Sequence, residues 1–148
     1  MEVRELADGF IEALHQLEKG DDNTDAALDA LVGLYASDAR LTNAALRLTN
    51  EEKTGTDQIR KFWSEYKRTL GEAYSDFHQV TVNEDAAGLF WVTKGRDVQG
   101  QDGAVHYDGT TLLVFNDDGK ISYFQGYYDT RQLNRQMGVE PEPAKKAA

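Results

Sequence analysis

The spacing of apolar residues changes once along this chain, at Gly71, and that change restricts the fold more than any other feature of the sequence. Before Gly71, apolar residues recur every three or four positions, which predicts helices that each turn one face to a core. After Gly71 they alternate with polar residues, which predicts strands. Helices followed by consecutive strands indicate an α+β domain, because an α/β domain would need the two to alternate.

Three helices are expected before Gly71, and their limits are marked by residues that commonly start or end a helix. The first stops at Gly20, the second starts at Asn23 or Thr24, and Thr56 caps the third. The three apolar faces comprise Leu6, Phe10, Leu14 and Leu17; Leu28, Leu31, Val32 and Tyr35; and Ile59, Phe62, Trp63, Tyr66 and Leu70.

Strands are expected after Gly71, and turn residues separate them. The alternating segments are 78–82, 89–98, 105–115 and 121–128. The turns between them are 83–85, 99–103 and 116–119, and the last carries a hairpin signature. Earlier in the chain, a turn over 37–43 leads into a short strand, and the polar stretch 50–53 is expected to be a loop. A short helix over 130–137 ends the ordered part.

The chain is expected to form one domain over residues 1–139. A length of 148 residues suits a single domain with a substantial core. Residues 140–148 are rich in Pro, Glu, Lys and Ala and bring almost no apolar surface, so a disordered tail is expected there.

Composition excludes several classes of function. The formal net charge is −10, and such a chain repels nucleic-acid phosphates and anionic membranes. The absence of Cys removes disulfides, thiolate catalysis and Cys-based metal sites. The first residues lack a signal-peptide pattern and no run approaches the about 20 apolar residues of a membrane span, so a cytoplasmic location is expected.

The three histidines do not have the spacing of a metal motif, so neither a metal nor another cofactor is expected. His15 is expected on a solvated helix flank. His78 is expected to be half-buried on the same sheet face as Val80 and Val82. His106 shares a strand face with Asp108, and such a pair can act as a base and its orienting group.

Four strings in order along the chain resemble the nuclear transport factor 2-like superfamily, and its SnoaL-like branch in particular. They are Leu34–Ala39, Gly55–Ile59 with Phe62-Trp63 behind it, Asp118–Ile121, and Tyr127–Asp129 leading to Arg135–Gly138. The resemblance implies a cone-shaped, curved antiparallel sheet wrapped around the N-terminal helices, a cystatin-like α+β barrel with a pocket. It does not imply one activity, because this fold hosts isomerases, hydrolases, cyclases, dehydratases and binding proteins.

The positions that carry ketosteroid isomerase chemistry in that superfamily hold other residues here. The place of the general base falls on Asn43, and an amide cannot take a proton from carbon. The two oxyanion-hole places fall on Ala13 and Thr111. The resemblance therefore does not extend to that reaction.

Two other activities of the superfamily can be compared in the same way. In limonene epoxide hydrolases an Asp on the final strand activates water, and its place here is Gly126; Arg96 and Asp97 are adjacent and so point to opposite faces. Polyketide cyclases carry an Asp before a short C-terminal helix, and Asp129 occupies that place. Asp129 is also a natural helix cap.

Strand alternation predicts the residues that line the pocket. If Thr111 faces inward, so do Tyr107, Gly109 and Leu113, and on the last strand Phe124, Gly126 and Tyr128 follow. The same alternation points His106 and Asp108 away from the pocket, which favours a solvated or interface pair over a catalytic one. Tyr35, Asn43 and Trp63 are expected to join them. Lys94 and Arg96 share a face and could reach the pocket mouth. This mostly aromatic lining suits a small, mostly apolar ligand.

Three functions remain open. The first is binding of a small apolar molecule by Tyr35, Asn43, Trp63, Tyr107, Thr111, Phe124 and Tyr128. The second is a non-catalytic dimerisation or interaction module whose pocket is filled by Trp63, Phe124 and Tyr128. The third is a cofactor-independent isomerase, cyclase or lyase that uses Asp129 or His106, and it requires one of these side chains inside the cavity. A homodimer is expected through the uncovered sheet face, which is expected to carry Val80 and Val82.

Overall fold

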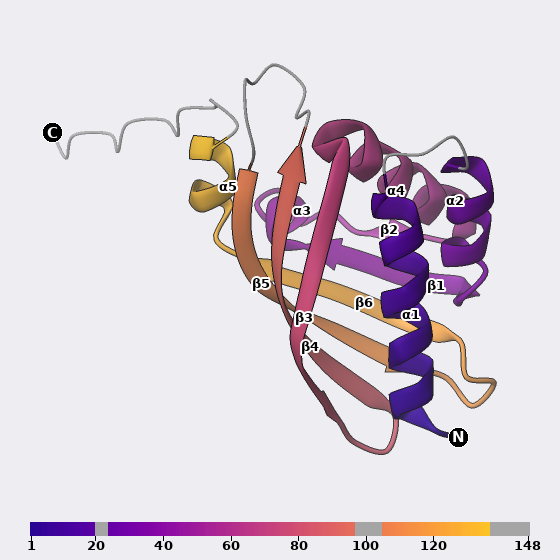
Figure 1. The fold of residues 1–148 in the computed structure, drawn as a ribbon. Helices are drawn as coiled ribbons and strands as arrows, with labels where there is room; N and C mark the ends of the chain where they lie inside the picture. Colours follow the sequence, from indigo (N-terminus) through magenta and orange to yellow (C-terminus); the bar gives the residue numbers. More distant parts are fainter. Residues whose placement is uncertain (20–23, 97–104, 137–148) are drawn as a thin grey trace, which may run out of the picture.

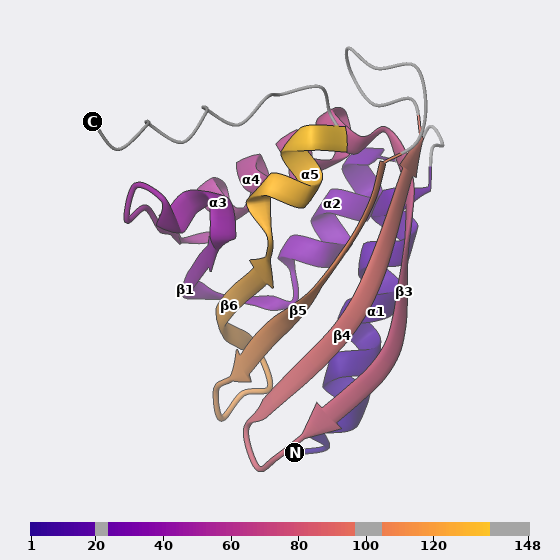
Figure 2. The same cartoon turned by 90° about the vertical axis from the view of Figure 1, so that its left-hand side faces the viewer.

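Six strands form one curved sheet, and helices lie against its concave side (Figures 1 and 2). The computed structural model describes residues 1–19, 24–96 and 105–136. The helices are α1 Val3–Glu18, α2 Thr24–Val32, α3 Ala44–Arg47, α4 Thr56–Leu70 and α5 Thr130–Gln136. The strands are β1 Tyr35–Asn43, β2 Lys53–Thr54, β3 Glu72–Val82, β4 Ala86–Arg96, β5 Val105–Phe115 and β6 Ile121–Tyr128.

The order of strands across the sheet is β2-β1-β6-β5-β4-β3, so β2 and β3 are its edges and the sheet does not close. Neighbouring strands are antiparallel except β1 and β6, which run parallel. The predicted α+β class, with a curved sheet around the N-terminal helices, is confirmed. The parallel pair differs from the expected antiparallel arrangement. It forms because β6, which follows the antiparallel strands β3, β4 and β5, lies beside β1 and runs in the same direction.

The core lies between α1, α2, α4 and the inner face of the sheet. Phe10, Trp63 and Phe124 form its aromatic centre, with ring centroids 5.5 to 6.3 Å apart in edge or tilted contacts. Their side chains come from α1, α4 and β6, so this cluster joins two helices to the middle of the sheet. Around this centre lie aliphatic side chains that are each 1% exposed or less, among them Leu17, Leu31, Leu41, Ile59, Leu89 and Leu113.

A bulge between Phe77 and Gln79 changes which side chains of β3 face the helices. One extra residue at a bulge reverses the alternation beyond it. His78 is exposed, and Val80 is half-buried against the core. The expectations of a half-buried His78 and an outward-facing Val80 are therefore wrong. Val82 is exposed, but it shares the face of Val80, because it pairs with the buried Ala87.

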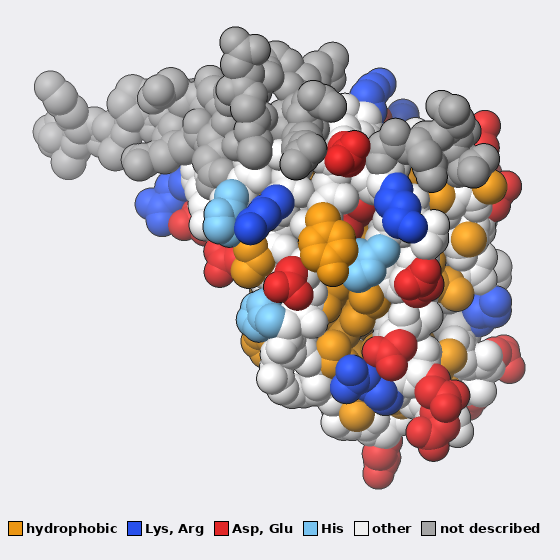
Figure 3. Space-filling model, in the orientation of Figure 1, with side chains coloured by type: hydrophobic (Ala, Val, Ile, Leu, Met, Phe, Trp, Pro, Cys, Tyr) orange, Lys and Arg blue, Asp and Glu red, His pale blue; other side chains and the backbone are white. Residues whose placement is uncertain are grey.

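The edge between α1 and β3 also differs from expectation, because His15 is not on a solvated flank. Its Nε2 donates to the carbonyl oxygen of Ser75 at 2.7 Å, and its ring stacks on Tyr74 with centroids 4.8 Å apart. In Figure 3, hydrophobic side chains gather where α1 meets β3, with acidic side chains around them. His15 thus helps to hold α1 against the sheet edge.

Several boundaries were predicted correctly and others were not. β5, β6 and the helix from Thr56 to Leu70 have the expected limits. α2 ends at Val32, and Tyr35 begins β1, a nine-residue strand where a turn was expected. Thr56 is the first residue of α4 and not its cap; the N-cap is Gly55, whose φ of 84° favours glycine.

The turn between β5 and β6 forms as its sequence predicts. Asn116 Oδ1 accepts hydrogen bonds from the backbone N–H groups of Asp118 and Lys120, both at 3.0 Å, and Gly119 has φ 75°. The short elements α3 and β2 were not predicted, and Lys53 belongs to β2 rather than to a loop. The expected features at Gly20, Asn23, 97–103 and 137–148 lie outside the described residues.

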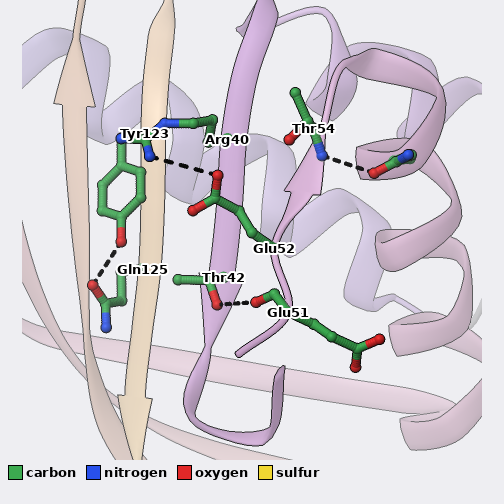
Figure 4. A network of polar contacts seen from close by, with 8 residues as sticks. Arg40, Thr42, Glu51, Glu52, Thr54, Tyr123 and Gln125 are labelled. Atoms are coloured by element: carbon green, nitrogen blue, oxygen red, sulfur yellow. Dashed lines mark hydrogen bonds and ion pairs between the residues drawn. The ribbon is translucent and has the colours of Figure 1, made fainter. Parts of the chain in front are cut away.

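Polar contacts hold the segment that contains β2 against β1 and β6 (Figure 4). The Arg40 guanidinium lies 4.8 Å from the ring centroid of Tyr123 and 3.5 Å from a carboxylate oxygen of Glu52. Thr42 Oγ1 donates to the carbonyl oxygen of Glu51 at 2.9 Å. Partly exposed contacts of this kind stabilise the fold weakly, and their effect is to set the position of the loop after α3.

Replacement of Leu113 by Ala should lower the free energy of unfolding by about 2–5 kcal/mol, because its fully buried side chain faces the core from β5. The matched variant Leu112→Ala changes the neighbouring, half-buried residue on the other face and should cost at most about half as much. Urea unfolding of both variants measures the difference. Equal losses would show that the inward face of β5 has been assigned wrongly.

Candidate functional site

A cavity of about 370 Å³ lies between α1, α4, α5 and the inner face of the sheet. Aromatic rings supply most of its wall. They belong to Phe10, Phe62, Trp63, Tyr66, Phe77, Trp91, Tyr107, Phe124 and Tyr128. Burial raises the pKa values of the three lining tyrosines Tyr66, Tyr107 and Tyr128, so their phenols stay uncharged. The aromatic part of the wall is thus uncharged and mostly apolar, with hydroxyl groups at a few points.

Most of the residues predicted to bind a ligand lie on this wall: Asn43, Trp63, Tyr107, Thr111, Phe124 and Tyr128. Tyr35 is the exception. It is buried behind Trp63, whose indole Nε1 donates to the Tyr35 hydroxyl at 3.1 Å. Tyr35 therefore orients Trp63 in the wall and does not itself face the cavity.

Trp91 was not predicted, although it crosses the floor of the cavity. Its Nε1 donates to Thr111 Oγ1 at 2.9 Å, and its six-membered ring lies over Gly109 on β5. A Cβ atom at Gly109 would lie 2.8 Å from Cζ2 of Trp91, so only glycine leaves room for the ring. Because Thr111 accepts from Trp91, its own hydroxyl hydrogen remains available to a ligand.

Asn43 has a structural role at the cavity wall. Its Oδ1 accepts a hydrogen bond from the backbone N–H of Leu46 at 2.8 Å and so caps α3. Gly126, on β6, lies beside it, since a Cβ at Gly126 would be 3.5 Å from Cβ of Asn43. Ala13 packs against the core and carries no polar group. Asn43, Ala13 and Thr111 therefore bring no ionisable side chain to the places that resemble those of ketosteroid isomerases.

A buried carboxylate, that of Glu18 at the end of α1, lies behind the cavity wall; Glu18 is 1% exposed. Its Oε2 accepts from the Tyr66 hydroxyl and from Ser75 Oγ, each at 2.6 Å, and its Oε1 accepts from the Ser75 backbone N–H at 2.9 Å. Ser75 Oγ also lies 2.6 Å from Thr93 Oγ1. Tyr66, Ser75 and Thr93 line the cavity, so Glu18 lies directly behind its surface.

Sequence reasoning missed Glu18, although a signal for it existed. It stands four residues after Leu14 and next to Leu17, and therefore belongs to the apolar face of the first helix. A charged residue in that position must be buried with partners or disturb the helix. The partners Tyr66 and Ser75 could not be identified, because they lie 48 and 57 positions further along the chain.

Lys67 fixes the end of α1 beside the end of α4. Its Nζ donates to the carbonyl oxygens of Glu18, Lys19 and Gly71, at 3.2, 2.7 and 3.1 Å. These carbonyls belong to helix C-termini, where a positive charge is favourable. Glu18 is held next to Tyr66 by this contact. The charge of Glu18 adds to the effect of burial in raising the pKa of Tyr66 well above its usual value, so Tyr66 remains a donor.

The two residues predicted to be catalytic lie outside the cavity. Asp129 is exposed and caps α5, since its Oδ1 accepts from the backbone N–H of Arg131 at 2.9 Å. This hydrogen bond and the Arg131 side chain hold the pKa of Asp129 below its usual value. His106 is exposed on the outer face of β5, opposite Lys94. The condition for acid–base chemistry by these residues, a place inside the cavity, is not met.

In the part of the chain that the structure describes, three charged side chains lie around the cavity, and Lys94, which was considered for its mouth, is not among them. Lys53, Lys61 and Glu65 contribute to the wall, whereas Lys94 points from the outer face of β4. Within residues 1–19, 24–96 and 105–136, no cluster of three or more His, Asp or Glu side chains could hold a metal ion. None of the helices in these ranges combines the length and apolar character needed to cross a bilayer.

This chain resembles known proteins in both its sequence and its fold. The family profile described as a SnoaL-like domain matches residues 8–124. Curated protein sequences yield no match. Among solved structures, a hypothetical protein from Catenulispora acidiphila with a ketosteroid isomerase-like fold, in complex with trimethylamine, superposes with a TM-score of 0.70 at 19% identity, covering 89% of this chain and 93% of that one.

Two further solved structures have the same fold. An NTF2-like protein of unknown function from Burkholderia pseudomallei has a TM-score of 0.74 at 15% identity, covering 93% of this chain and 98% of its own. TerC, crystallised with polyporic acid, has a TM-score of 0.74 at 12% identity, covering 93% and 99%. Identities this low establish a shared fold and leave the ligand open.

Replacement of Gly109 by Ala should displace the Trp91 ring, because the new Cβ would overlap the Tyr127 carbonyl oxygen and the indole. We expect a loss of about 1–3 kcal/mol in the free energy of unfolding and a change in tryptophan fluorescence. Gly126→Ala is the matched control, since its Cβ would make only ordinary contacts at 3.5 and 3.7 Å. Unchanged fluorescence in Gly109→Ala would contradict the close approach of Trp91.

Proposed function

The chain belongs to the SnoaL-like domain family, whose profile matches residues 8–124, and from that premise we propose that it binds a small, mostly apolar molecule in its aromatic cavity. The observation that carries the proposal is the cavity itself. A volume of about 370 Å³ lies within the range typical of small-molecule sites, and apolar walls with a few polar groups are typical of them.

The cavity wall is suited to a flat or cyclic ligand. Trp63 makes edge contacts with Phe62, Tyr66 and Phe124, at centroid distances of 5.1 to 5.5 Å, so these rings hold one another in place. Pre-organised rings lose little entropy when a ligand enters. The Thr111 hydroxyl, oriented by Trp91, can donate one hydrogen bond to the ligand.

The solved relatives support binding of small molecules in general terms. The protein from Catenulispora acidiphila is in complex with trimethylamine, and TerC was crystallised with polyporic acid. These two compounds differ greatly in size and charge. The relatives therefore support a ligand cavity and do not select one ligand class for this chain.

The two alternative functions have less support. A filled pocket would need Trp63, Phe124 and Tyr128 to occupy the space, and they line it instead. An acid–base role for Asp129 or His106 would need a substrate outside the cavity, because both side chains lie on the surface.

A small neutral aromatic compound such as 2-methylnaphthalene should bind and quench the fluorescence of Trp63 and Trp91. Gly126→Leu should abolish this binding, because the added side chain would project toward Asn43 and Phe124. Gly9→Leu is the control, since the same side chain there enters open space. Absence of binding to the unchanged protein, or equal binding by both variants, would contradict the proposal.

A homodimer is proposed as well, through the outer face of the sheet. This face carries exposed Phe90 and Tyr127, with exposures of 36% and 48%. Exposed apolar groups on one face commonly mark an interface. Light scattering at micromolar concentration should give twice the mass of one chain, and Phe90→Lys should shift the protein toward the monomer. A monomer before any substitution would contradict this proposal.

A further inference from the structure

We propose that Glu18 makes one end of the cavity a hydrogen-bond acceptor site that selects a ligand bearing a protonated amine. This end, called the inner end below, is lined by Tyr66, Ser75 and Thr93. This inference rests on the proposed binding function and adds to it the chemical class of the ligand's polar group. It follows from the direction in which each buried hydroxyl must point its single hydrogen atom.

The first step concerns the donors around Glu18. A carboxylate only accepts hydrogen bonds, so the Tyr66 hydroxyl, the Ser75 hydroxyl and the Ser75 backbone N–H must all donate to it. The two hydroxyl bonds are 2.6 Å long, which is typical of bonds from O–H to a charged oxygen. Glu18 thus determines where the hydrogens of Tyr66 and Ser75 point.

The second step concerns the direction of the hydrogen bond between Ser75 and Thr93. Ser75 Oγ has already given its hydrogen to Glu18, so in the 2.6 Å contact between Ser75 and Thr93 the donor must be Thr93. Neither Tyr66 nor Thr93 then has a hydrogen left for a ligand. What remains on both oxygens is lone pairs, and both residues line the cavity.

At the other end of the cavity, the wall offers a hydrogen-bond donor to a ligand instead of acceptors. Thr111 accepts from Trp91 and keeps its hydrogen for a ligand. Thr93 pairs with Tyr107 and Leu89 pairs with Thr111, so Thr93 and Thr111 lie four residues apart along neighbouring strands, or about 13 Å. The cavity therefore accepts hydrogen bonds at one end and donates at the other, and a ligand with a donor and an acceptor at its two ends would fit this order.

Charge favours an ammonium group over other donors at the inner end. The Glu18 carboxylate lies one hydrogen bond behind Tyr66 and would attract a cation and repel an anion. Aromatic rings also attract cations, and Trp63, Tyr66 and Phe77 line this region. An ammonium group has several N–H donors, which can meet the lone pairs of Tyr66 and Thr93 together.

Three probes with the same ring system test the inference by calorimetry at pH 7: 2-naphthylmethylamine, 2-naphthoate and 2-methylnaphthalene. The amine should bind the unchanged protein at least about tenfold more tightly than the carboxylate. In Glu18→Gln, the amide N–H₂ must donate to Tyr66 or Ser75 and so turns a hydroxyl hydrogen toward the cavity. The preference for the amine should then fall about tenfold, while the neutral probe binds as before.

Controls separate this positioning role from a structural one. Glu12→Gln makes the same chemical change on the exposed side of the same helix and should leave all three affinities unchanged. Tyr66→Phe keeps the ring but removes the acceptor oxygen, and it should also lose the preference for the amine. If circular dichroism shows that Glu18→Gln does not fold, the Tyr66→Phe variant alone tests the inference.

Two results would overturn the inference. One is binding of 2-naphthoate by the unchanged protein as tightly as the amine. The other is an equal loss of affinity for all three probes in Glu18→Gln and Tyr66→Phe, which would show that Glu18 only supports the wall. If 2-methylnaphthalene itself fails to bind the unchanged protein, the proposed function fails and the inference fails with it.

Discussion

Burial of the Glu18 carboxylate is costly unless each oxygen has hydrogen-bond partners, and satisfying it constrains much of the surrounding structure. Ser75 must lie within 2.9 Å through its backbone N–H, which brings the start of β3 against the end of α1. Tyr66 must reach the same carboxylate from α4. One group therefore ties together the two longest helices and the edge of the sheet, and the contacts that it requires form one wall of the cavity.

The aromatic cluster supplies the other constraint. Phe10, Trp63 and Phe124 meet in edge or tilted contacts where α1, α4 and β6 converge, and each ring is held by its neighbours. Such packing leaves the helices at a fixed distance from the sheet without filling the space further along it. The cavity is what remains between this cluster and the floor formed by Trp91, which rests on Gly109.

The family supplies a fold that can carry different chemistry at the same place. At Asn43, Ala13 and Thr111 this chain has a helix cap, a packing residue and a hydroxyl oriented by an indole. Its buried carboxylate stands elsewhere, at the end of α1. In the proposed arrangement, Tyr66 and Thr93 offer acceptor oxygens at one end of the cavity and the Thr111 hydroxyl is the donor at the other.

The sequence by itself determined the class of fold, because the change of apolar period at Gly71 is a local property of the chain. It also determined β5, β6, the Asn116 turn and the part of the aromatic wall formed by β5 and β6, since strand alternation assigns inward side chains once one of them is known. It did not reveal β3 before residue 78, because two of its three inward residues there, Ala73 and Ser75, are small and do not give an apolar alternation; the third is Phe77.

Only the tertiary structure decided the bulge at His78, the contacts of His15 with β3, and the partners of Glu18. Each of these depends on residues brought together from distant parts of the chain. Burying the Glu18 carboxylate costs free energy only once α1 packs on the sheet, and the hydrogen bonds from Ser75 offset that cost. Local patterns show which residues prefer to be buried, and the packing of the elements decides which buried polar groups meet.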